Sequence, residues 1–417
     1  KYIDKMGLFR RNKNNNKPII KQIIDLIPAH LIQKVTQRYQ SDKGRSKYRT
    51  YDQLVSLLFG QLNKCHTLED ISVGIGASKT FIRDLGLKQS PAKSTMSDGN
   101  KIRTYKVFES LYMNLLSYYG NLLKRHSHHK VLEEVKTKSV LFRDSSTISV
   151  CLSLFDWAKY RTAKGGLKIH TQWDEAMMMP NLINISEAAV HDRKGFEDVV
   201  FPKDTIIVED KGYWDFTIIK ARILAENCFV TRIKNNTVYT VVEELNLPEK
   251  EDQHILLDEI IQLTGNQAKK VGIEKMKFRR VVAYHEEENT TIEIISNNLE
   301  WKASTIAELY RRRWDIETFF KKLKQNLNVK TFIGTSENAV KSQIFVALIA
   351  YLLLELMRRV ASKGKTAFSN FVEKIRICLP FYLSLDYVMN NIKPIAQKAE
   401  KPPPKPDLWK STQLNLF

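Results

Sequence analysis

The stretch KSVLFRDSSTISV, residues 138–150, marks a change in the hydrophobic period of the chain. Apolar and polar residues alternate in it and β-branched residues are frequent, which predicts a β-strand. Two more strand candidates follow, GLKIHTQWDE (166–175) and NLINISEAAVHD (181–192), and then TIIVED (205–210), a short apolar run typical of the centre of a sheet. KGYWDFTIIKARILAENC has a helical period, and FVTRIK after it favours a strand. This order of elements predicts a mixed α/β core.

Upstream of this strand, residues 17–125 have a helical period and lack strand alternation. Segments such as IIKQIIDLIPAHLIQKV and TYDQLVSLLFGQL place apolar residues at i, i+3, i+4 and i+7. Polar connectors separate the short helices, and SDKGRSKYR (41–49) is strongly basic. A small helical domain with basic connectors is a common geometry for reading the major groove of DNA, but many plain helical bundles fit the same description. Both interpretations stay open at this stage.

Downstream of the core, the chain becomes β-rich and then helical again. Residues 236–300 favour strands, with HEEENTT as a hairpin turn, and we interpret them as an insertion. A helix is expected from about Ser304 to Leu327, followed by IFVALIAYLLLELM (344–357) as a buried core helix, too short and too charged for a membrane span. The Pro- and Lys-rich end cannot form a core. The predicted divisions are an N-terminal helical DNA-binding domain (1–130), the first part of the α/β core (131–235), the β-rich insertion (236–300), the second part of the core with the charged helix (301–360), and a C-terminal helical segment with the tail (361–417).

Composition narrows the class of protein. The 417 residues are 43% apolar and 10% aromatic, which excludes wholesale disorder. The formal net charge is +20, and residues 1–50 hold thirteen Lys or Arg against three Asp. A basic balance of this size favours a polyanionic partner, with nucleic acid first. The four cysteines are widely spaced without a ligand pattern, and no secretory signal is visible, so we expect reduced thiols and a cytoplasmic location.

The helix that contains YRRRWDIETFFKKLKQ (310–325) concentrates cations around one glutamate. On a helical projection, Tyr310, Arg313, Glu317 and Lys324 share a stripe roughly 60° wide beside the apolar face. A carboxylate there suits a divalent metal, while Arg and Lys suit phosphate oxygens. The alternative is an ordinary amphipathic helix with an intrahelical pair between Arg313 and Glu317.

Two aspartates are the candidate partners of this glutamate. Asp144 lies in the middle of the predicted strand 138–150, and Asp210 ends the apolar strand 205–210. Together with Glu317 they would supply the hard oxygen ligands of a two-metal site for phosphoryl chemistry. The alternatives are a salt bridge of Asp144 with Arg143 or a turn role for it, and a helix N-cap for Asp210.

Histidines near these strands call for a structural interpretation first. His170 and His191 lie in or at the end of strand candidates and could approach the cleft of the candidate metal site. Such residues are more often hydrogen-bonded structural histidines. Asp192 is expected to be a turn residue.

The pattern Tyr310-x2-Arg313-x3-Glu317-x6-Lys324 resembles the Tyr-Arg-Glu-Lys signature of the DDE transposases of bacterial insertion-sequence family four. FRDSSTI is similar to the first-aspartate strand of that family and VEDKGYWDF to its second-aspartate motif, while the segment IIKQIIDLI…SDKGRSKYRTYDQLVSLLFGQL looks like a domain found at the front of such transposases. The resemblance covers nearly the whole chain.

The resemblance implies an RNase H-like core interrupted by the β-rich insertion, with Asp144, Asp210 and Glu317 as catalytic metal ligands for two Mg²⁺ ions, or Mn²⁺ in their place. In the family such ions activate water to nick the element end, and the freed 3′-hydroxyl attacks again, often through a hairpin. Tyr310, Arg313 and Lys324 would contact DNA phosphates, with Lys211 and Trp214 as further DNA-contact candidates. The expected partners are double-stranded transposon ends and target DNA, bound by a homodimer. The alternatives are an RNase H-like nuclease without strand transfer, or a catalytically silent DNA-binding remnant of an element.

Overall fold

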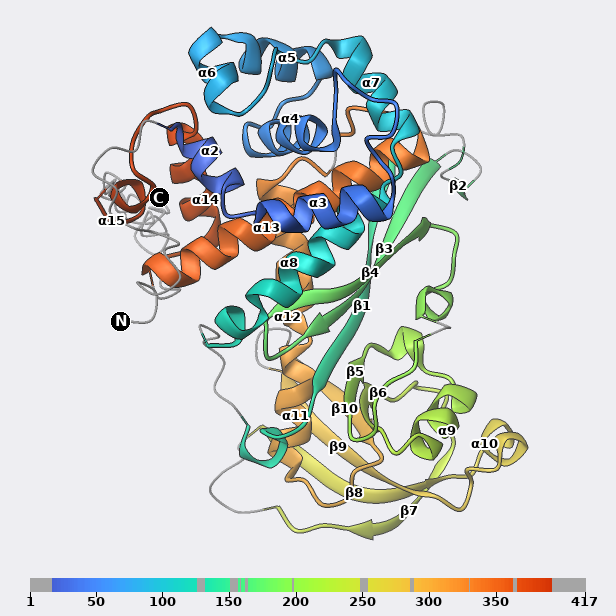
Figure 1. The fold of residues 1–417 in the computed structure, drawn as a ribbon. Helices are drawn as coiled ribbons and strands as arrows, with labels where there is room; N and C mark the ends of the chain where they lie inside the picture. Colours follow the sequence, from blue (N-terminus) through green and yellow to red (C-terminus); the bar gives the residue numbers. More distant parts are fainter. Residues whose placement is uncertain are drawn as a thin grey trace, which may run out of the picture.

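A large mixed β-sheet runs through the molecule, and helices pack on it (Figure 1). In the computed structural model the strand order is β2-β3-β1-β5-β6-β10-β9-β8-β7, and β4 pairs with β3. The structure describes residues 17–125, 132–150, 157, 159–161, 164–196, 199–247, 254–285, 289–329, 331–362 and 366–391. The strands are β1 (Val140–Val150), β2 (Lys159–Arg161), β3 (Lys164–Asp174), β4 (Met179–Glu187), β5 (Ile206–Glu209), β6 (Cys228–Arg232), β7 (Tyr239–Glu244), β8 (Ile255–Leu263), β9 (Lys277–His285) and β10 (Thr290–Ser296). The mixed α/β expectation is confirmed.

Helices make up both ends of the described part of the chain and connect some of the strands. The α-helices are α2 (Ile19–Ile24), α3 (Ala29–Arg38), α4 (Thr50–Leu62), α5 (Leu68–Gly76), α6 (Lys79–Asp84), α7 (Lys93–Ile102), α8 (Lys106–Arg125), α9 (Phe216–Leu224), α10 (Asn266–Val271), α11 (Ala303–Arg312), α12 (Trp314–Asn326), α13 (Glu337–Ser362), α14 (Phe368–Cys378) and α15 (Leu385–Asn391). Short 3₁₀ helices are η1 (Glu133–Val135), η2 (Asp192–Phe196) and η3 (Lys211–Tyr213).

The centre of the sheet is parallel. β5 pairs in parallel with β1 on one side and β6 on the other, and all four of its residues are buried. An apolar strand of this kind needs cover on both faces. The helix α11 contacts β5 and β6 and α12 contacts β1, while α9 contacts β6. Parallel strands direct their carboxyl ends to the same edge, which is where open α/β sheets bind ligands.

The predicted strands correspond closely to the observed ones on this side of the sheet. The predicted strands 138–150, 166–175 and 205–210 are β1, β3 and β5. The predicted strand 181–192 is β4, but it ends at Glu187, so His191 and Asp192 lie beyond it. The short strand β2 was not predicted.

The β-rich segment 236–300 extends this sheet. β10 pairs antiparallel with β6, and β9, β8 and β7 follow in order to the far edge. A second hydrophobic cluster packs beneath these strands and includes Phe229, Ile261 and Phe278. β9 and β10 pair as a hairpin in which His285 is opposite Thr290, while residues 286–288 of the predicted turn lie outside the described residues. The short helix α10 inside this segment was not predicted.

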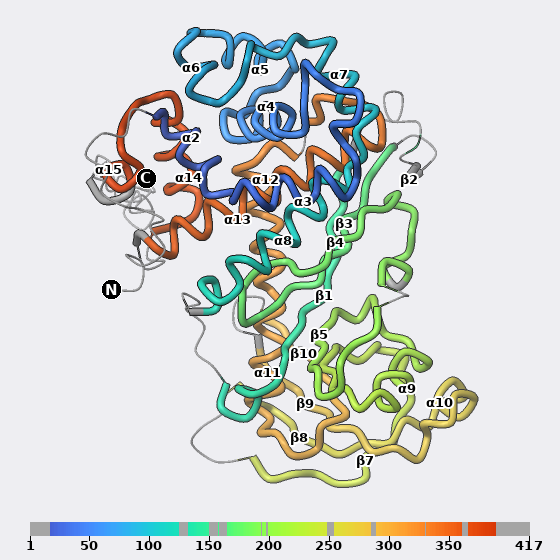
Figure 2. The backbone as a smooth tube through the Cα atoms, viewed as in Figure 1, coloured from blue at the N-terminus to red at the C-terminus, as the bar shows by residue number. Residues whose placement is uncertain are grey.

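The N-terminal helices pack around the long apolar helix α13. In both views the blue helices of the N-terminal part lie beside the orange and red helices of the C-terminal part (Figures 1 and 2). α4, α7 and α8 all contact α13, and the Ile19 amide donates to the Phe381 carbonyl oxygen at 3.0 Å. Among the described residues, Glu337–Val360 is one helix long and apolar enough to cross a membrane, and 94% of its apolar window is buried inside the protein. The expectation of a buried core helix is confirmed, whereas the division at residue 130 stays a prediction.

The expected helix from Ser304 to Leu327 is two helices. α11 ends at Arg312 and α12 begins at Trp314, with Arg313 between them in a turn of nearly helical dihedral angles. The single-helix prediction was therefore wrong at this residue. Because Arg313 is both the end of one helix and the start of the next, its side chain is directed by two packed elements.

Candidate active site

Two parallel strands bring the candidate aspartates side by side. Arg143 of β1 is the register partner of Glu209 of β5, and this is the last paired position of β5. Asp144 and Asp210 are each the next residue along the chain. Since side chains alternate along a strand, Asp144 points to the face opposite that of Arg143.

The helices α11 and α12 supply the partners of both aspartates. Arg313 donates from Nη1 to Asp144 Oδ2 at 2.9 Å and from Nη2 to Glu317 Oε1 at 2.8 Å. The Tyr310 hydroxyl donates to Asp210 Oδ1 at 3.2 Å. Residues from β1, the end of β5, α11 and α12 therefore meet at one place. The contact of Tyr310 with Asp210 joins residues 100 positions apart in the sequence, and that of Arg313 with Asp144 joins residues 169 positions apart.

Burial makes the electrostatics of this place strong. Burial raises the pKa of the Asp144 carboxyl to about 6, and the negative charges of Glu317 and Asp210 act in the same direction, whereas Arg313 and the Ser145 amide oppose the shift. Burial alone would lower the pKa of Arg313, but Tyr310, Asp144 and Glu317 around it raise its pKa further above the usual range. Arg313 is thus a buried cation held by at least two carboxylates.

The contacts of Arg143 and Asp210 differ from the alternative roles expected for the acids, whereas the intrahelical pair is present. Arg143 pairs with Glu209 on the opposite face, so it is not the partner of Asp144. Asp210 precedes η3 as its N-cap residue, but its side chain makes no capping hydrogen bond within that described helix. The intrahelical pair between Arg313 and Glu317 is present, and the same guanidinium also reaches Asp144.

The other predicted DNA-contact residues differ in position and exposure. Lys324 Nζ donates to Ser146 Oγ at 2.6 Å and to the Thr147 carbonyl oxygen at 3.1 Å, so it lies along β1 beyond Asp144. Lys211 is exposed at the start of η3. Trp214 is different, because its side chain is only 5% exposed and packs in the second hydrophobic cluster. The indole is a core group in this fold, which argues against direct contact with DNA.

The neighbouring strands and η2 add residues that sequence reasoning did not assign to the site. Asp192 Oδ1 accepts a 2.6 Å hydrogen bond from Ser145 Oγ and lies 3.1 Å from Lys168 Nζ. Ser145 in turn donates its backbone amide to Asp144 Oδ1 at 2.8 Å. Asp192 therefore contacts the strand that carries Asp144, and it begins the 3₁₀ helix η2 where a turn residue was predicted. No local signal could have shown this, because the contacts join β1, β3 and η2.

His170 is a structural residue in this fold. Its side chain is fully buried, and Nε2 lies 2.9 Å from Ser186 Oγ, with the ring of Phe196 packed edge-on against the imidazole. The structural interpretation of His170 agrees with these contacts. His191 is exposed beyond the end of β4.

Comparison with known proteins shows the family of this chain. The family model of the transposase DDE domain matches residues 136–353, which is more than half of the chain and contains all three candidate acids. The chain belongs to the transposase DDE domain family. A second family model, a domain of unknown function designated DUF4372, matches residues 15–88 in the N-terminal part of this chain.

Several relatives carry names that agree with the family. A protein of Geobacillus stearothermophilus named as the probable transposase for insertion sequence element IS5377 is 29% identical over 244 residues, which are 58% of this chain and 63% of that relative. A protein of Sinorhizobium fredii named as a transposase is 28% identical over 65% of this chain and 73% of its own, and one of Synechocystis named for insertion sequence element IS4SA is 27% identical over 69% and 77%. The match to the Geobacillus relative thus spans less than two thirds of that protein.

A solved structure is similar over most of the chain. It is the piggyBac transposase synaptic complex with hairpin DNA, with a TM-score of 0.40 and 11% sequence identity, covering 89% of this chain and 81% of that chain.

The transposase DDE domain implies a divalent metal, and the donor chemistry of the site is compatible with one. Asp144, Asp210 and Glu317 offer the carboxylate oxygens that Mg²⁺ and Mn²⁺ prefer. Within the described part of the chain, no three His, Cys, Asp or Glu side chains are grouped so that they could hold a metal ion. The guanidinium of Arg313 lies between Asp144 and Glu317 instead. These carboxylates are thus gathered around a positive charge, and a metal would compete with Arg313 for them.

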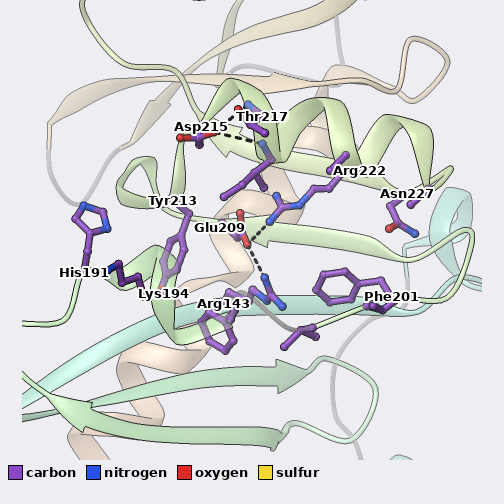
Figure 3. A pocket seen from close by; sticks show the side chains of 16 residues that line it. Arg143, His191, Lys194, Phe201, Glu209, Tyr213, Asp215, Thr217, Arg222 and Asn227 are labelled. Atoms are coloured by element: carbon purple, nitrogen blue, oxygen red, sulfur yellow. Dashed lines mark hydrogen bonds and ion pairs between the residues drawn. The ribbon is translucent and has the colours of Figure 1, made fainter. Parts of the chain in front are cut away.

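A pocket of about 570 Å³ lies on the other face of the same strands (Figure 3). Arg143 and Glu209 line it, together with Arg222 of α9, and dashed contacts join all three in the view. Asp144, Asp210 and Glu317 are not among its lining residues. Asp144 and this pocket therefore lie on opposite faces of β1.

Proposed function

We propose that the chain is the transposase of an insertion sequence, which binds the terminal inverted repeats and catalyses metal-dependent DNA cleavage followed by strand transfer. The observation that carries the proposal is the contact of Arg313 with both Asp144 and Glu317, next to the pair of Tyr310 with Asp210, in a chain of the transposase DDE domain family. The relatives named for insertion sequences support the same class.

The three acids would then share the task of binding metal. Asp144, Asp210 and Glu317 would hold two divalent ions, Mg²⁺ or Mn²⁺, which supply an activated water and stabilise charge at phosphorus. Asp144 is sensitive to a lost cation, because burial raises the pKa of its carboxyl while Arg313 opposes that shift. The cation beside it keeps this carboxylate ionised at neutral pH.

The basic and aromatic groups would hold the DNA strand. The planar guanidinium of Arg313 is suited to phosphate oxygens. When Asp144 and Glu317 bind a metal, a phosphate would take their place as the partner of Arg313. Tyr310 and Lys324 would contact the same strand near the cleaved end, with exposed Lys211 as an additional phosphate contact. This assignment follows the Tyr-Arg-Glu-Lys pattern of insertion-sequence family four. The sheet around β1 and β5 would then be the RNase H-like core.

The remaining parts of the molecule would bind and pair the ends. The net charge of +20 favours a polyanion, and the N-terminal helices would read the terminal repeat. A homodimer on two paired ends, acting in the cytoplasm on the bacterial nucleoid, completes the proposal.

Cleavage of DNA that carries the element ends tests the proposal. Asp144→Asn, Asp210→Asn and Glu317→Gln should each abolish Mg²⁺-dependent cleavage while the variants still bind the DNA, because each loses a metal ligand but keeps its size. Asp204→Asn is the matched control, because Asp204 lies at the surface and pairs with Lys138. Cleavage at the normal rate by one of the three variants would remove that residue from the metal site.

A strand-transfer assay distinguishes the alternatives. Donor DNA joined to target DNA is expected of a transposase, whereas cleavage without a joined product would indicate an RNase H-like nuclease. DNA binding without cleavage by the unmutated chain would indicate a silent remnant. Terminal inverted repeats and short target duplications around the reading frame would be independent support for the transposase.

A further inference from the structure

A buried ionic cluster lies directly behind the two candidate aspartates. Arg143 and Glu209 are the residues immediately before Asp144 and Asp210 in the chain, and Arg143 points to the face of β1 opposite that of Asp144. Arg143 and Glu209 are only 4% and 1% exposed. Figure 3 shows Glu209 between Arg143 and Arg222, with a dashed contact to each.

The cluster joins strands at one level of the sheet. Glu209 Oε1 accepts from Arg143 Nη1 at 3.4 Å and from Arg222 Nη2 at 2.6 Å, which ties β1 and β5 to α9. Arg143 Nε also donates to Gln172 Oε1 of β3 at 3.4 Å, and Gln172 donates to Asn181 of β4 at 3.1 Å. A continuous row of polar contacts therefore runs from β4 through β3 and β1 to β5.

This row lies where the backbone ladder ends. The pair of Arg143 with Glu209 is the last register position between β1 and β5, and Asp210 already belongs to the turn into η3. Beyond this position no strand pairing of β5 holds the backbone of Asp210. The side chains of the last pair are thus the nearest constraint on the separation of the two aspartates.

Stability alone is a poor reason for such a cluster. Charges removed from water lose hydration, and replacing a buried ionic group by apolar side chains of similar volume is often neutral or stabilising. The two arginines outnumber the single glutamate, and the rings of Phe196 and Phe201 lie 4.2 and 4.4 Å from the Arg143 guanidinium. The Arg143 guanidinium is thus enclosed by two rings and by long hydrogen bonds to Glu209 and Gln172, and Glu209 has a short bond to Arg222.

We propose that Arg143, Glu209 and Arg222 form a clamp that fixes the spacing of Asp144 and Asp210 from the opposite face of the sheet, with Glu209 as its central positioning residue. The clamp rests on the proposed function, since the spacing matters for metal binding and cleavage. Its three members touch neither DNA nor metal, and they act through the two strands. A displacement of about 1 Å in a catalytic group can lower a rate by about 100-fold, which sets the size of the expected effect.

The decisive variant removes all three charges together. Arg143→Met, Glu209→Leu and Arg222→Met in one chain leave no unpaired charge in the interior, so the protein should fold with a melting temperature equal to or above that of the wild type. Cleavage of end DNA should nevertheless fall by about 100-fold. Mn²⁺ binding to the DNA-free protein, followed by electron paramagnetic resonance, should weaken by at least about tenfold for the same reason. Amide hydrogen exchange should become faster at residues 143–146 and 208–211.

Two comparisons separate position from stability. The single variant Arg222→Lys keeps a cation beside Glu209 and should recover most of the cleavage that Arg222→Met loses. The double variant Asp258→Leu with Arg279→Met removes another buried ion pair, between β8 and β9, and should leave cleavage and Mn²⁺ binding unchanged.

Failure of the clamp and failure of the proposed function give different results. Wild-type rates of cleavage and exchange in the triple variant would overturn the clamp, as would equal losses in the Asp258–Arg279 control. A wild-type chain that does not cleave DNA would overturn the proposed function instead. In that case the exchange rates at residues 143–146 and 208–211 still decide whether the cluster holds the two strand ends.

Discussion

At the scale of single residues, Arg313 is the side chain on which the site depends. Its two terminal nitrogens contact carboxylates on different elements, Asp144 of β1 and Glu317 of α12. Its Nε is buried without a hydrogen-bond partner among the described residues. Without a metal, Arg313 would keep Asp144 and Glu317 ionised and close together. Once those carboxylates bound a metal, the guanidinium would be able to bind a phosphate.

The planar fork of Arg313, as well as its charge, is therefore expected to matter. Arg313→Lys keeps the positive charge but offers a single ammonium group, which cannot make the same two bonds to Asp144 and Glu317. We expect cleavage of end DNA to fall by about tenfold or more, because each tenfold loss corresponds to about 1.4 kcal/mol of transition-state stabilisation and one charged hydrogen bond contributes about that much. Initial cleavage rates at saturating Mg²⁺ measure the effect.

Arg311→Lys is the matched control for that measurement. Arg311 lies two positions before Arg313, in the last turn of α11, and its largely exposed side chain pairs with Glu308. Equal rates for the two lysine variants would show that the geometry of the Arg313 guanidinium is unimportant.

At the scale of elements, the packing of η2 against β3 holds one wall of the site. A side-chain carbon at Gly195 of η2 would collide with the His170 ring, so the glycine allows this close approach. The imidazole Nδ1 is buried and has no hydrogen-bond partner within the described residues. Burial lowers the pKa of His170 to about 4, with Lys168 acting in the same direction and Asp192 opposing it.

This buried histidine predicts a loss of stability in acid. The unfolded chain takes up a proton near the ordinary pKa of 6.5, while the folded chain does so only near 4. Stability from this group is thus complete above about pH 6.5 and decreases as the pH falls toward 4, by up to about 1.4 kcal/mol per pH unit. Urea unfolding at pH 7, 6 and 5 should show a smaller pH dependence for His170→Gln than for the wild type.

The exposed His30 offers the control for this slope. His30→Gln should keep the wild-type pH dependence between pH 7 and 5. An unchanged slope in His170→Gln would mean that other groups cause the acid sensitivity.

At the scale of the whole molecule, the helix α13 connects the two halves of the chain. Its surface is covered by α4, α7 and α8 from the N-terminal part and by α12 and α14 from the C-terminal part. Glu355 of α13 pairs with Arg358 and Arg359, and Arg359 Nη1 donates to the Met177 carbonyl oxygen at 2.8 Å, next to β4. The N-terminal helices and the sheet therefore share one interior.

Removal of the N-terminal helices should consequently expose the core of the rest. A fragment that begins at residue 131 would leave much of α13 open to water, and large exposed apolar patches promote aggregation. We expect this fragment to elute in the void volume in size-exclusion chromatography, whereas the full chain elutes as a discrete species. A monodisperse fragment with a cooperative thermal transition would contradict this and would support independent folding of residues 131–417.

The local hydrophobic pattern was sufficient to predict strands and helices whose burial follows from their own residues. The alternation of residues 138–150 and the apolar run 205–210 predicted β1 and β5, because each period follows from the burial of one or both faces of a strand. The short length and charges of residues 344–357 predicted a core helix, whereas the spacing of Tyr310, Arg313 and Glu317 predicted a single helix that is in fact broken at Arg313.

Tertiary structure alone decided how those elements meet. The sequence by itself determined an α/β chain with a basic surface, three candidate acids and a charged helix, since composition and period are properties of neighbouring residues. It did not determine that β7 to β10 extend the central sheet, that the helix breaks at Arg313, or that Trp214 is buried. Nor did it indicate that Arg143 pairs with Glu209 behind Asp144 and Asp210. Each of these depends on strand order, register and packing between segments far apart in the chain, and such contacts leave no periodic signal in either segment alone.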